Sequence, residues 1–314
     1  MKMMIRCMST SSAGLVLALW LLPVPPLSAD QWTVDTARAA AAKGDARAEC
    51  YLAQCYAKGQ DVPRNYDKAA EYFRQAAEQG NARAQAGLGS CYARGEGVKQ
   101  DYGQALKWYH QAAAQGDALA EYCLGYAFAH GKGVPKDMDA AIGWWQKSAE
   151  QGEVYAQNAL GQLYCYGEHT GDTNRINYAA SAKWLRKAAD QGSLPAMSTL
   201  GYLYANGWGV KGDSQEALKW YRRAAEQGDP AAQDSLGLMY ENGNAGLPID
   251  LVQAYKWFRL SEEQGNPFGR HDAIEIELHH VLTPEQTREA ERLVVEFHMR
   301  MATNRPGDNP GTPN

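Results

Sequence analysis

The sequence predicts an all-α protein, a right-handed solenoid of six helix-turn-helix repeats with capping helices at both ends. Three observations predict this fold. The chain of 314 residues repeats itself at a period of about 36 residues, its apolar positions recur at spacings that place them on one helix face, and glycines follow the expected helices at fixed positions. Because one repeat buries its apolar face only against its neighbours, this period indicates stacked layers rather than separate globular domains.

Residues 1–29 have the pattern of a cleaved export signal. Lys2 and Arg6 form a short basic region, residues 13–22 form an apolar core, and Ala29 provides a small residue before the expected cut. Prolines that begin at Pro23 stop the apolar core short of the about 20 residues that a membrane span needs. We therefore expect a mature protein that is periplasmic or secreted and is not stably inserted in the membrane. A signal retained as an anchor is the alternative.

A short capping segment precedes the repeats. Ala40, Ala41 and Gly44 match the end of a repeat, so we expect a half repeat over residues 35–44 and, within residues 30–44, a capping helix that covers the first layer. Six units follow, and each of them ends in Gln-Gly. They span residues 45–80, 81–116, 117–152, 153–192, 193–228 and 229–265.

Each unit is expected to contain two helices joined by a glycine-rich turn. The first helix carries an Ala, a Leu four residues later, a small residue and then an aromatic. In the second unit these residues are Ala84, Leu88, Gly89 and Tyr92. The second helix carries a tryptophan column, to which Trp144 belongs in the third unit. Small residues let neighbouring helices approach, and we expect the aromatic columns, Trp144 included, to fill the holes between layers.

Residues 85–116 are among the clearest copies of the pattern A-x-x-x-L-G-x-x-Y-x-x-G-x-G-V-x-x-D-x-x-x-A-x-x-W-Y-x-x-A-A-x-x-G. This pattern resembles the Sel-one-like repeat family, relatives of the tetratricopeptide repeats, over residues 45–265. The first unit departs from it at Ala53 and Asp61, where the family prefers glycine. The resemblance implies a solenoid whose first helices line a concave wall. It also implies a scaffold function, because family relatives control sensors and envelope assemblies.

A second cap is expected within residues 266–302. Residues 267–279 have the pattern of one more first helix. Thr283, with Pro284 at the first helical position, then opens a closing helix that runs to about Met299. The remaining segment, residues 303–314, is rich in Pro, Gly and Asn, and we expect it to be disordered.

Signatures of common enzymes are missing from the expected mature sequence. It contains no G-x-S-x-G, S-x-x-K, H-E-x-x-H or G-x-x-x-x-G-K-[ST], so we predict no catalytic residue and no cofactor. His271, His279, His280 and His298 gather near the C-terminus. Adjacent side chains on a helix diverge by about 100°, so we expect solvated histidines and no metal site. Some members of the family have been described as binding or hydrolysing β-lactams. An envelope hydrolase acting on a β-lactam or a cell-wall substrate is therefore the alternative function.

Five cysteines remain after the expected signal cut, so at least one must be unpaired. Cys50 and Cys55 lie about 140° apart on one helix and cannot pair with each other. Cys91 with Cys123 is the pairing that we consider, and buried free thiols are the alternative. Cysteine-rich members of the family have a bridge in each repeat, but no cysteine here occupies a second helix, so that scheme is not expected.

The resemblance places the first helices on the concave wall, so their side chains outside the packing stripe are expected to face a partner. These candidates are Arg47, Lys58, Arg83, Arg94, Tyr122, Tyr126, Tyr155, Tyr166 and Tyr202. A basic end followed by a tyrosine-lined middle suits an extended peptide with acidic and apolar parts. Tyr126 and Tyr202 in particular are expected to line the groove without holding the repeats together. The alternative is that some of these tyrosines pack within their own layer.

The expected partner is a protein or peptide, and the expected function is that of an exported interaction scaffold, one that regulates an envelope sensor or assembly. The formal net charge is -5, and the sequence has no dense run of Lys and Arg. An acidic chain of this kind is a poor match for a phosphate backbone, so we expect no nucleic-acid partner.

Overall fold

The structure is a computed structural model that describes residues 32–167, 175–266 and 282–303. Within these ranges every regular element is a helix and none is a strand, which confirms the all-α prediction. Three predicted segments lie outside the described residues: the signal peptide, the helix over residues 267–279 and the tail beyond Thr303. His271, His279 and His280 also lie outside them.

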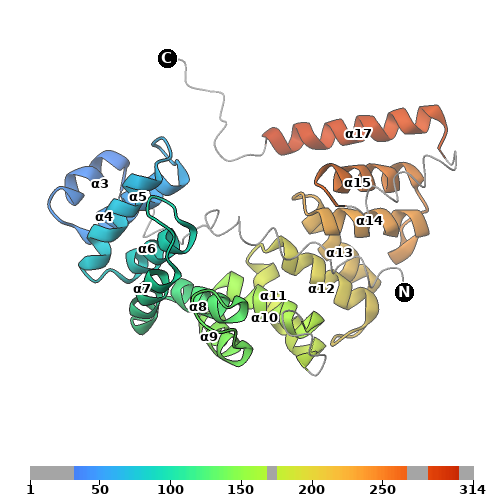
Figure 1. The fold of residues 1–314 in the computed structure, drawn as a ribbon. Helices are drawn as coiled ribbons and strands as arrows, with labels where there is room; N and C mark the ends of the chain where they lie inside the picture. The colour runs from blue at the N-terminus through green and yellow to red at the C-terminus, as the bar shows by residue number, and fades with distance from the viewer. Residues whose placement is uncertain (1–31, 168–174, 267–281, 304–314) are drawn as a thin grey trace, which may run out of the picture. The chain divides into compact units, whose positions relative to one another are not determined.

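Each repeat contributes two consecutive helices, which follow one another in the order of the chain (Figure 1). The first helices are α4 (Ala46–Lys58), α6 (Ala82–Arg94), α8 (Ala118–His130), α10 (Val154–Tyr166), α12 (Leu194–Asn206) and α14 (Pro230–Asn242). The second helices are α5 (Tyr66–Glu78), α7 (Tyr102–Ala114), α9 (Met138–Glu150), α11 (Tyr178–Asp190), α13 (Ser214–Ala225) and α15 (Leu251–Glu263). The other elements are α3 (Val34–Ala41), η3 (Asn244–Gly246) and α17 (Pro284–Thr303).

Contacts divide the described chain into two compact units. One unit contains residues 32–163 and Gly167, and within it the helices from α3 to α9 each pack on the next. The other unit contains Tyr164–Tyr166 and the described residues from Arg175 onwards. Within this second unit α11 to α15 pack in sequence, and α17 packs on α15. Packing between consecutive helices is the arrangement that stacked repeats require.

Polar caps and glycines set the bounds of the helices. The backbone N–H of Ala84 donates to Asn81 Oδ1 at 2.9 Å at the start of α6, and Gly95 follows the helix with a φ of 73°. A side-chain oxygen at the helix start and a left-handed residue after its end satisfy backbone groups that the helix leaves unpaired. All first helices are followed by such a glycine: Gly59, Gly95, Gly131, Gly167, Gly207 and Gly243.

The apolar columns of the first helices lie in the interior. Both the Ala and the Leu column are at most 1% exposed in every repeat, which confirms that they form the packing stripe. Their members are Ala48, Ala84, Ala120, Ala156, Ala196 and Ala232, with Leu52, Leu88, Leu124, Leu160, Leu200 and Leu236.

The expectation for Trp144 is wrong, because the neighbouring Trp145 fills the interior of the third repeat. Trp145 is 2% exposed, whereas Trp144 is only half-buried. A Cβ placed on Gly125 would overlap the indole of Trp145, so this first-helix position must be glycine for α8 and α9 to pack as they do. The same contact recurs between Gly89 and Tyr109 in the second repeat. In the second and third repeats the ring that fills the interior therefore stands one residue after the tryptophan column, whereas Trp184, Trp220 and Trp257 of the last three repeats are themselves buried.

Asp61 departs from the family pattern and takes a left-handed backbone conformation, with a φ of 59°. Its equivalent in the second repeat is Gly97, where a Cβ would overlap the carbonyl of Tyr66 from the preceding second helix. The first repeat thus carries a side chain at a turn where the second repeat has room only for glycine.

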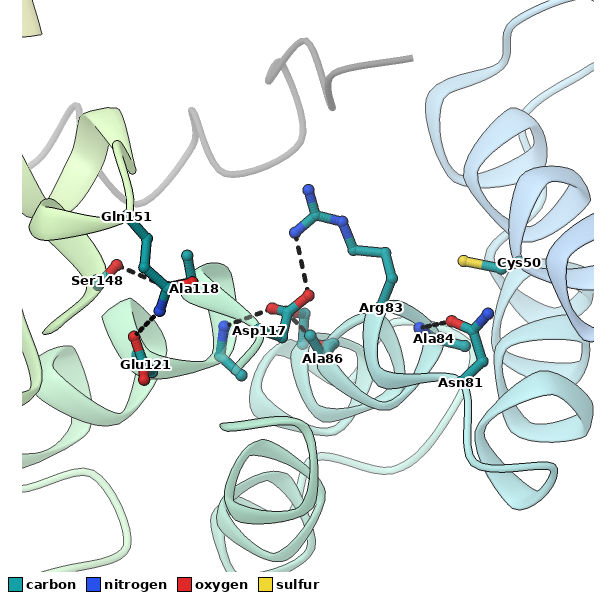
Figure 2. A network of polar contacts seen from close by, with 12 residues as sticks. Cys50, Asn81, Arg83, Ala84, Ala86, Asp117, Ala118, Glu121, Ser148 and Gln151 are labelled. Carbon is teal, nitrogen blue, oxygen red and sulfur yellow. Dashed lines mark hydrogen bonds and ion pairs between the residues drawn. The ribbon is translucent and has the colours of Figure 1, made fainter. Parts of the chain in front are cut away.

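A ladder of polar contacts joins consecutive repeats, and the sequence reasoning missed it. In the first, second, third and sixth repeats a glutamine that follows the second helix donates to a buried Glu or Gln near the start of the first helix of its own repeat. Gln115 Nε2 donates to Gln85 Oε1 at 2.8 Å. Figure 2 shows the equivalent contact in the third repeat, where Gln151 Nε2 donates to Glu121 Oε2 at 2.6 Å. Gln85 Nε2 in turn donates to the carbonyl of Ala77 in the preceding repeat at 3.2 Å. Gln157 and Gln233 make the same contact, so repeats one, three and five are each hydrogen-bonded to the repeat that follows, at a position that is shielded from water.

The C-terminal helix α17 ends at Thr303, four residues later than the sequence predicts. It covers α15 through Val294 and Phe297, and the rings of Phe297 and Trp257 lie 5.7 Å apart. Among the described residues, no helix has the length and apolar character needed to cross a membrane.

Candidate peptide-binding surface

The candidate binding residues all lie on one face of the first helices, which we call the first-helix stripe. In the second repeat the stripe consists of Arg83, Ala86, Ser90 and Arg94, at successive spacings of three, four and four residues. These spacings return to the same side of a helix. The stripe starts with basic residues in the first two repeats and changes to tyrosines in the next three.

Arg83 is held by an ion pair across neighbouring first helices. Its guanidinium lies 3.4 Å from Asp117 Oδ2, and Figure 2 shows the side chain reaching from α6 to the start of α8. Asp117 also accepts from the backbone N–H of Ala120 at 2.9 Å, so it caps α8. The Arg83 and Asp117 side chains are 28% and 10% exposed. Burial raises the pKa of Asp117, although the Arg83 charge opposes this rise.

The other basic residues of the stripe differ in their surroundings. Arg94 lies 3.7 Å from Glu96, and burial raises the pKa of that carboxyl although Arg94 opposes the rise. Lys58 is half-buried, and burial lowers its pKa, with the Arg83 charge acting in the same direction. Arg47 is exposed, with a weak contact of 3.7 Å to Asp45. Three of the four candidate cations are thus partly desolvated and held in place.

Two pairs of neighbouring aromatic rings lie on the stripe in the third and fourth repeats. The ring of Tyr122 lies 5.6 Å from that of Tyr155 on the next first helix, and Tyr126 stacks on His130 at 4.0 Å. Tyr122 is only 3% exposed, so the expectation that it faces a partner is wrong, whereas Tyr126 and Tyr155 keep part of their surface in water. Burial raises the pKa of Tyr155 to about 12, so the ring stays neutral at physiological pH.

Tyr202 belongs to the core of the compact unit that contains the described residues from Arg175 onwards. The expectation that it only lines a groove is wrong. It is 2% exposed, because the indole of Trp208 packs edge-on against it at 5.3 Å and the ring of Tyr166 lies 6.5 Å away. Trp208 comes from the glycine-rich turn of the same repeat, where the other repeats have Glu, Lys or a polar residue. That exceptional tryptophan is the signal that could have revealed the packing. Tyr166 remains half-buried.

The cysteine thiols are buried. Cys50, Cys55, Cys91 and Cys123 are free in the structure, so the Cys91–Cys123 bridge that we considered is not formed there. Burial raises the pKa of both Cys91 and Cys123 to about 12, which disfavours the reactive thiolate. No group of His, Cys, Asp and Glu among the described residues is arranged to hold a metal ion. His298 lies 2.6 Å from Glu263 Oε2.

Comparison with known proteins identifies the repeats. The Sel1 repeat family model matches six successive segments, residues 46–81, 82–117, 118–153, 154–193, 194–229 and 230–266. The chain belongs to the Sel1 repeat family. Sel1 repeats generally mediate protein–protein interaction, and their solenoids are typically scaffolds without enzymatic activity. None of the curated proteins compared with the chain matches it significantly.

Two solved structures resemble this Sel1 repeat protein. One is a protective antigen of uropathogenic Escherichia coli with an SLR fold, which is 30% identical, covers 90% of this chain and 68% of its own, and has a TM-score of 0.54. The other is a Sel1 repeat protein from Oxalobacter formigenes, which is 29% identical, covers 74% of this chain and 100% of its own, and has a TM-score of 0.64. Both support the α-solenoid fold.

Proposed function

We propose that this Sel1 repeat protein is an exported scaffold that binds an extended segment of a partner protein along the first-helix stripe of repeats one to four. The observation that carries the proposal is the order of side chains on this stripe. Partly desolvated cations at Lys58, Arg83 and Arg94 are followed by the half-buried rings of Tyr126 and Tyr155. Rigid aromatics and preorganised arginines are the residue types that dominate binding energy at protein interfaces.

The stripe favours a partner segment with acidic residues followed by apolar ones. The guanidinium of Arg83 has five N–H donors, and its single contact with Asp117 leaves most of them for a partner carboxylate. The tyrosine rings present flat apolar faces with a hydroxyl at the edge, which suits an apolar side chain and a neighbouring peptide group. Regulation of an envelope sensor or assembly is the role that we propose for this complex.

Capture of the partner from the cell envelope, with matched variants as bait, tests the binding site. The stripe variant carries Arg83→Gln, Tyr126→Ala and Tyr155→Ala, and the control variant carries Lys43→Gln, Lys99→Gln and Lys136→Gln in the same unit. We expect one protein to be retained by the wild-type chain and the control and to be lost from the stripe variant. If all three baits retained the partner equally, the binding site would lie outside the stripe.

Export is supported by the basic, apolar and small-residue pattern of residues 1–29. Sequencing of the N-terminus of the purified protein tests it. We expect a chain that begins near Asp30 and is recovered from the periplasm or the medium. Recovery of a chain that starts at Met1 from the cytosol would refute export while leaving the binding proposal standing.

A further inference from the structure

The second helices of repeats four and five carry a cluster of basic side chains that the proposed function does not use. α11 contributes Lys183, Arg186 and Lys187, and α13 contributes Lys219, Arg222 and Arg223; we call this set the basic face. The two helices together hold six basic and two acidic side chains. Five of the six cations are exposed, the exception being the partly buried Arg186. This concentration runs against the net charge of -5 of the whole chain.

Two tryptophans fix the position of these cations. The Nζ atoms of Lys187 and Lys183 lie 4.8 and 5.5 Å from the ring centre of Trp184. The guanidinium of Arg223 lies 5.7 Å from the ring centre of Trp220. Cations over an indole face are attracted by its ring electrons and lose part of their rotational freedom before any partner arrives.

Arg186 joins the two helices into one surface. Its guanidinium lies 5.3 Å from the Trp220 ring centre of α13, and it also donates to the hydroxyl of Tyr204. Arg186 of α11 and Arg223 of α13 therefore lie against the same Trp220 ring. Among the described residues, Lys219 is the cation of this face that forms an ion pair, and its partner is Glu216 at 2.5 Å. Lys183, Lys187, Arg222 and Arg223 have no carboxylate partner within the described chain.

The other repeats show that the fold does not require this charge. The positions equivalent to Lys183 and Lys187 are occupied by Glu71 and Gln75 in the first repeat. In the remaining repeats the same pairs are Lys107 with Gln111, Gly143 with Lys147, Lys219 with Arg223 and Lys256 with Leu260. Repeats four and five alone have a cation at both positions. Because all repeats form the same helix pair, the charge must serve something other than packing.

We propose that the basic face is a second docking surface, and that it binds an acidic segment of a protein. Exposed guanidinium and ammonium groups on a rigid base suit carboxylates spaced along a helix or an extended chain. A membrane surface is a poorer match, because Trp184 and Trp220 are 9% and 8% exposed and lie under the cations, so they cannot insert. Nucleic acid is a poorer match, because a chain with a pI near 5.8 repels a phosphate backbone beyond this face.

Binding of a fluorescein-labelled glutamate-rich peptide tests the proposal, with the glutamine version of the peptide as the neutral probe. The face variant is Lys183→Gln, Lys187→Gln, Arg222→Gln and Arg223→Gln. The control, Lys43→Gln, Lys99→Gln, Lys132→Gln and Lys136→Gln, removes the same charge from the other unit. We expect the face variant to bind the acidic peptide at least about tenfold more weakly than the wild-type chain, and the control to bind within about twofold. Equal losses in the two variants, or no binding by the wild-type chain, would overturn the proposal.

Lysine footprinting of the wild-type chain gives a second readout that does not depend on the folding of a variant. We expect the acidic peptide to protect Lys183, Lys187 and Lys219 from acetylation and to leave Lys132 reactive. The same titration with vesicles containing phosphatidylglycerol and with single-stranded DNA separates the other anions. If the vesicles or the DNA bound more tightly than the acidic peptide, and the face variant lost that binding, the ligand would be that anion and not an acidic protein segment. A dimer in light scattering that the face variant dissociates would assign the face to a second copy of the chain.

Discussion

Two adjacent tryptophans on α9 occupy opposite environments. Trp145 is 2% exposed and packs against Gly125 of α8. Trp144 is half-buried, with Lys147 above its ring at 4.6 Å and His110 of the preceding second helix at 6.0 Å. The first environment recurs in every repeat with a large apolar side chain. The position of Trp144 also has an aromatic ring in every repeat, but the charges around that ring change from one repeat to the next.

This difference separates the residues that build the solenoid from those that give it a partner. The interior column has little freedom, because the facing first helix has a glycine or alanine and leaves a space of fixed shape. The side chains beside the tryptophan column are free to change, since they meet water. The basic face is the point at which these neighbours become cationic in two consecutive repeats. A functional surface of a repeat protein can thus be recognised where equivalent outward positions diverge.

Replacing each tryptophan of α9 in turn gives the largest expected effect. Trp145→Ala should lower the free energy of unfolding by about 4 kcal/mol, because it leaves a cavity between α8 and α9. Trp144→Ala should lower it by about 1 kcal/mol, since that ring is only half-buried. Urea denaturation followed by circular dichroism measures both. Equal losses would contradict the division between interior and outward columns.

Two glycines of neighbouring helices provide the next comparison. Gly125→Ala should destabilise the chain by about 2 kcal/mol, because the added methyl overlaps Trp145 and forces α8 and α9 apart. Gly143 lies on the outward side of α9 with open space around it. Gly143→Ala should therefore stabilise the chain by about 0.5 kcal/mol through helix propensity alone. Thermal unfolding of the two variants checks the opposite signs.

The tyrosines of the stripe divide in the same way. Tyr202→Ala should cost about 3 kcal/mol, because it removes the ring that Trp208 covers. Tyr126→Ala should cost about 1 kcal/mol and should weaken binding of the partner retained by the wild-type chain by about 2 kcal/mol. Calorimetry of the fold and of the complex separates the two effects. A Tyr126→Ala variant that binds normally would remove this ring from the proposed site.

The sequence predicted the repeats and their main columns because these features recur six times and follow directly from helical spacing. Trp145 was missed because Trp144 belongs to the more regular column, and helical spacing does not say which of two adjacent aromatics faces the partner helix. Tyr202 was placed outside the core because periodicity describes one helix, whereas the residue that buries it, Trp208, comes from a turn. The Gln–Glu ladder was missed because polar residues are expected at the surface unless their partners are known.

That ladder gives a further expected effect, at Glu121. Its equivalents Gln85 and Gln233 each donate to a carbonyl of the preceding repeat, at 3.2 and 3.3 Å. Glu121 accepts from Gln151, but an ionised carboxylate cannot donate to the equivalent carbonyl. Burial raises the pKa of Glu121, and the hydrogen bond from Gln151 only partly opposes this rise.

The sign of the pH dependence follows from this raised pKa. A carboxyl whose pKa is higher in the folded chain contributes stability below its unfolded pKa, and that contribution is lost as the pH rises through the folded pKa. Glu121→Gln keeps the uncharged form at every pH and gains the missing donor, so it should stabilise the chain by about 1 kcal/mol at neutral pH. This gain should shrink as the pH falls toward about 4, where Glu121 itself is protonated. The reverse change, Gln85→Glu, should destabilise the second repeat at neutral pH, and the lost stability should return at low pH. Urea denaturation at several pH values measures both, and a gain for Glu121→Gln that is the same at all pH values would show that the carboxylate is not desolvated.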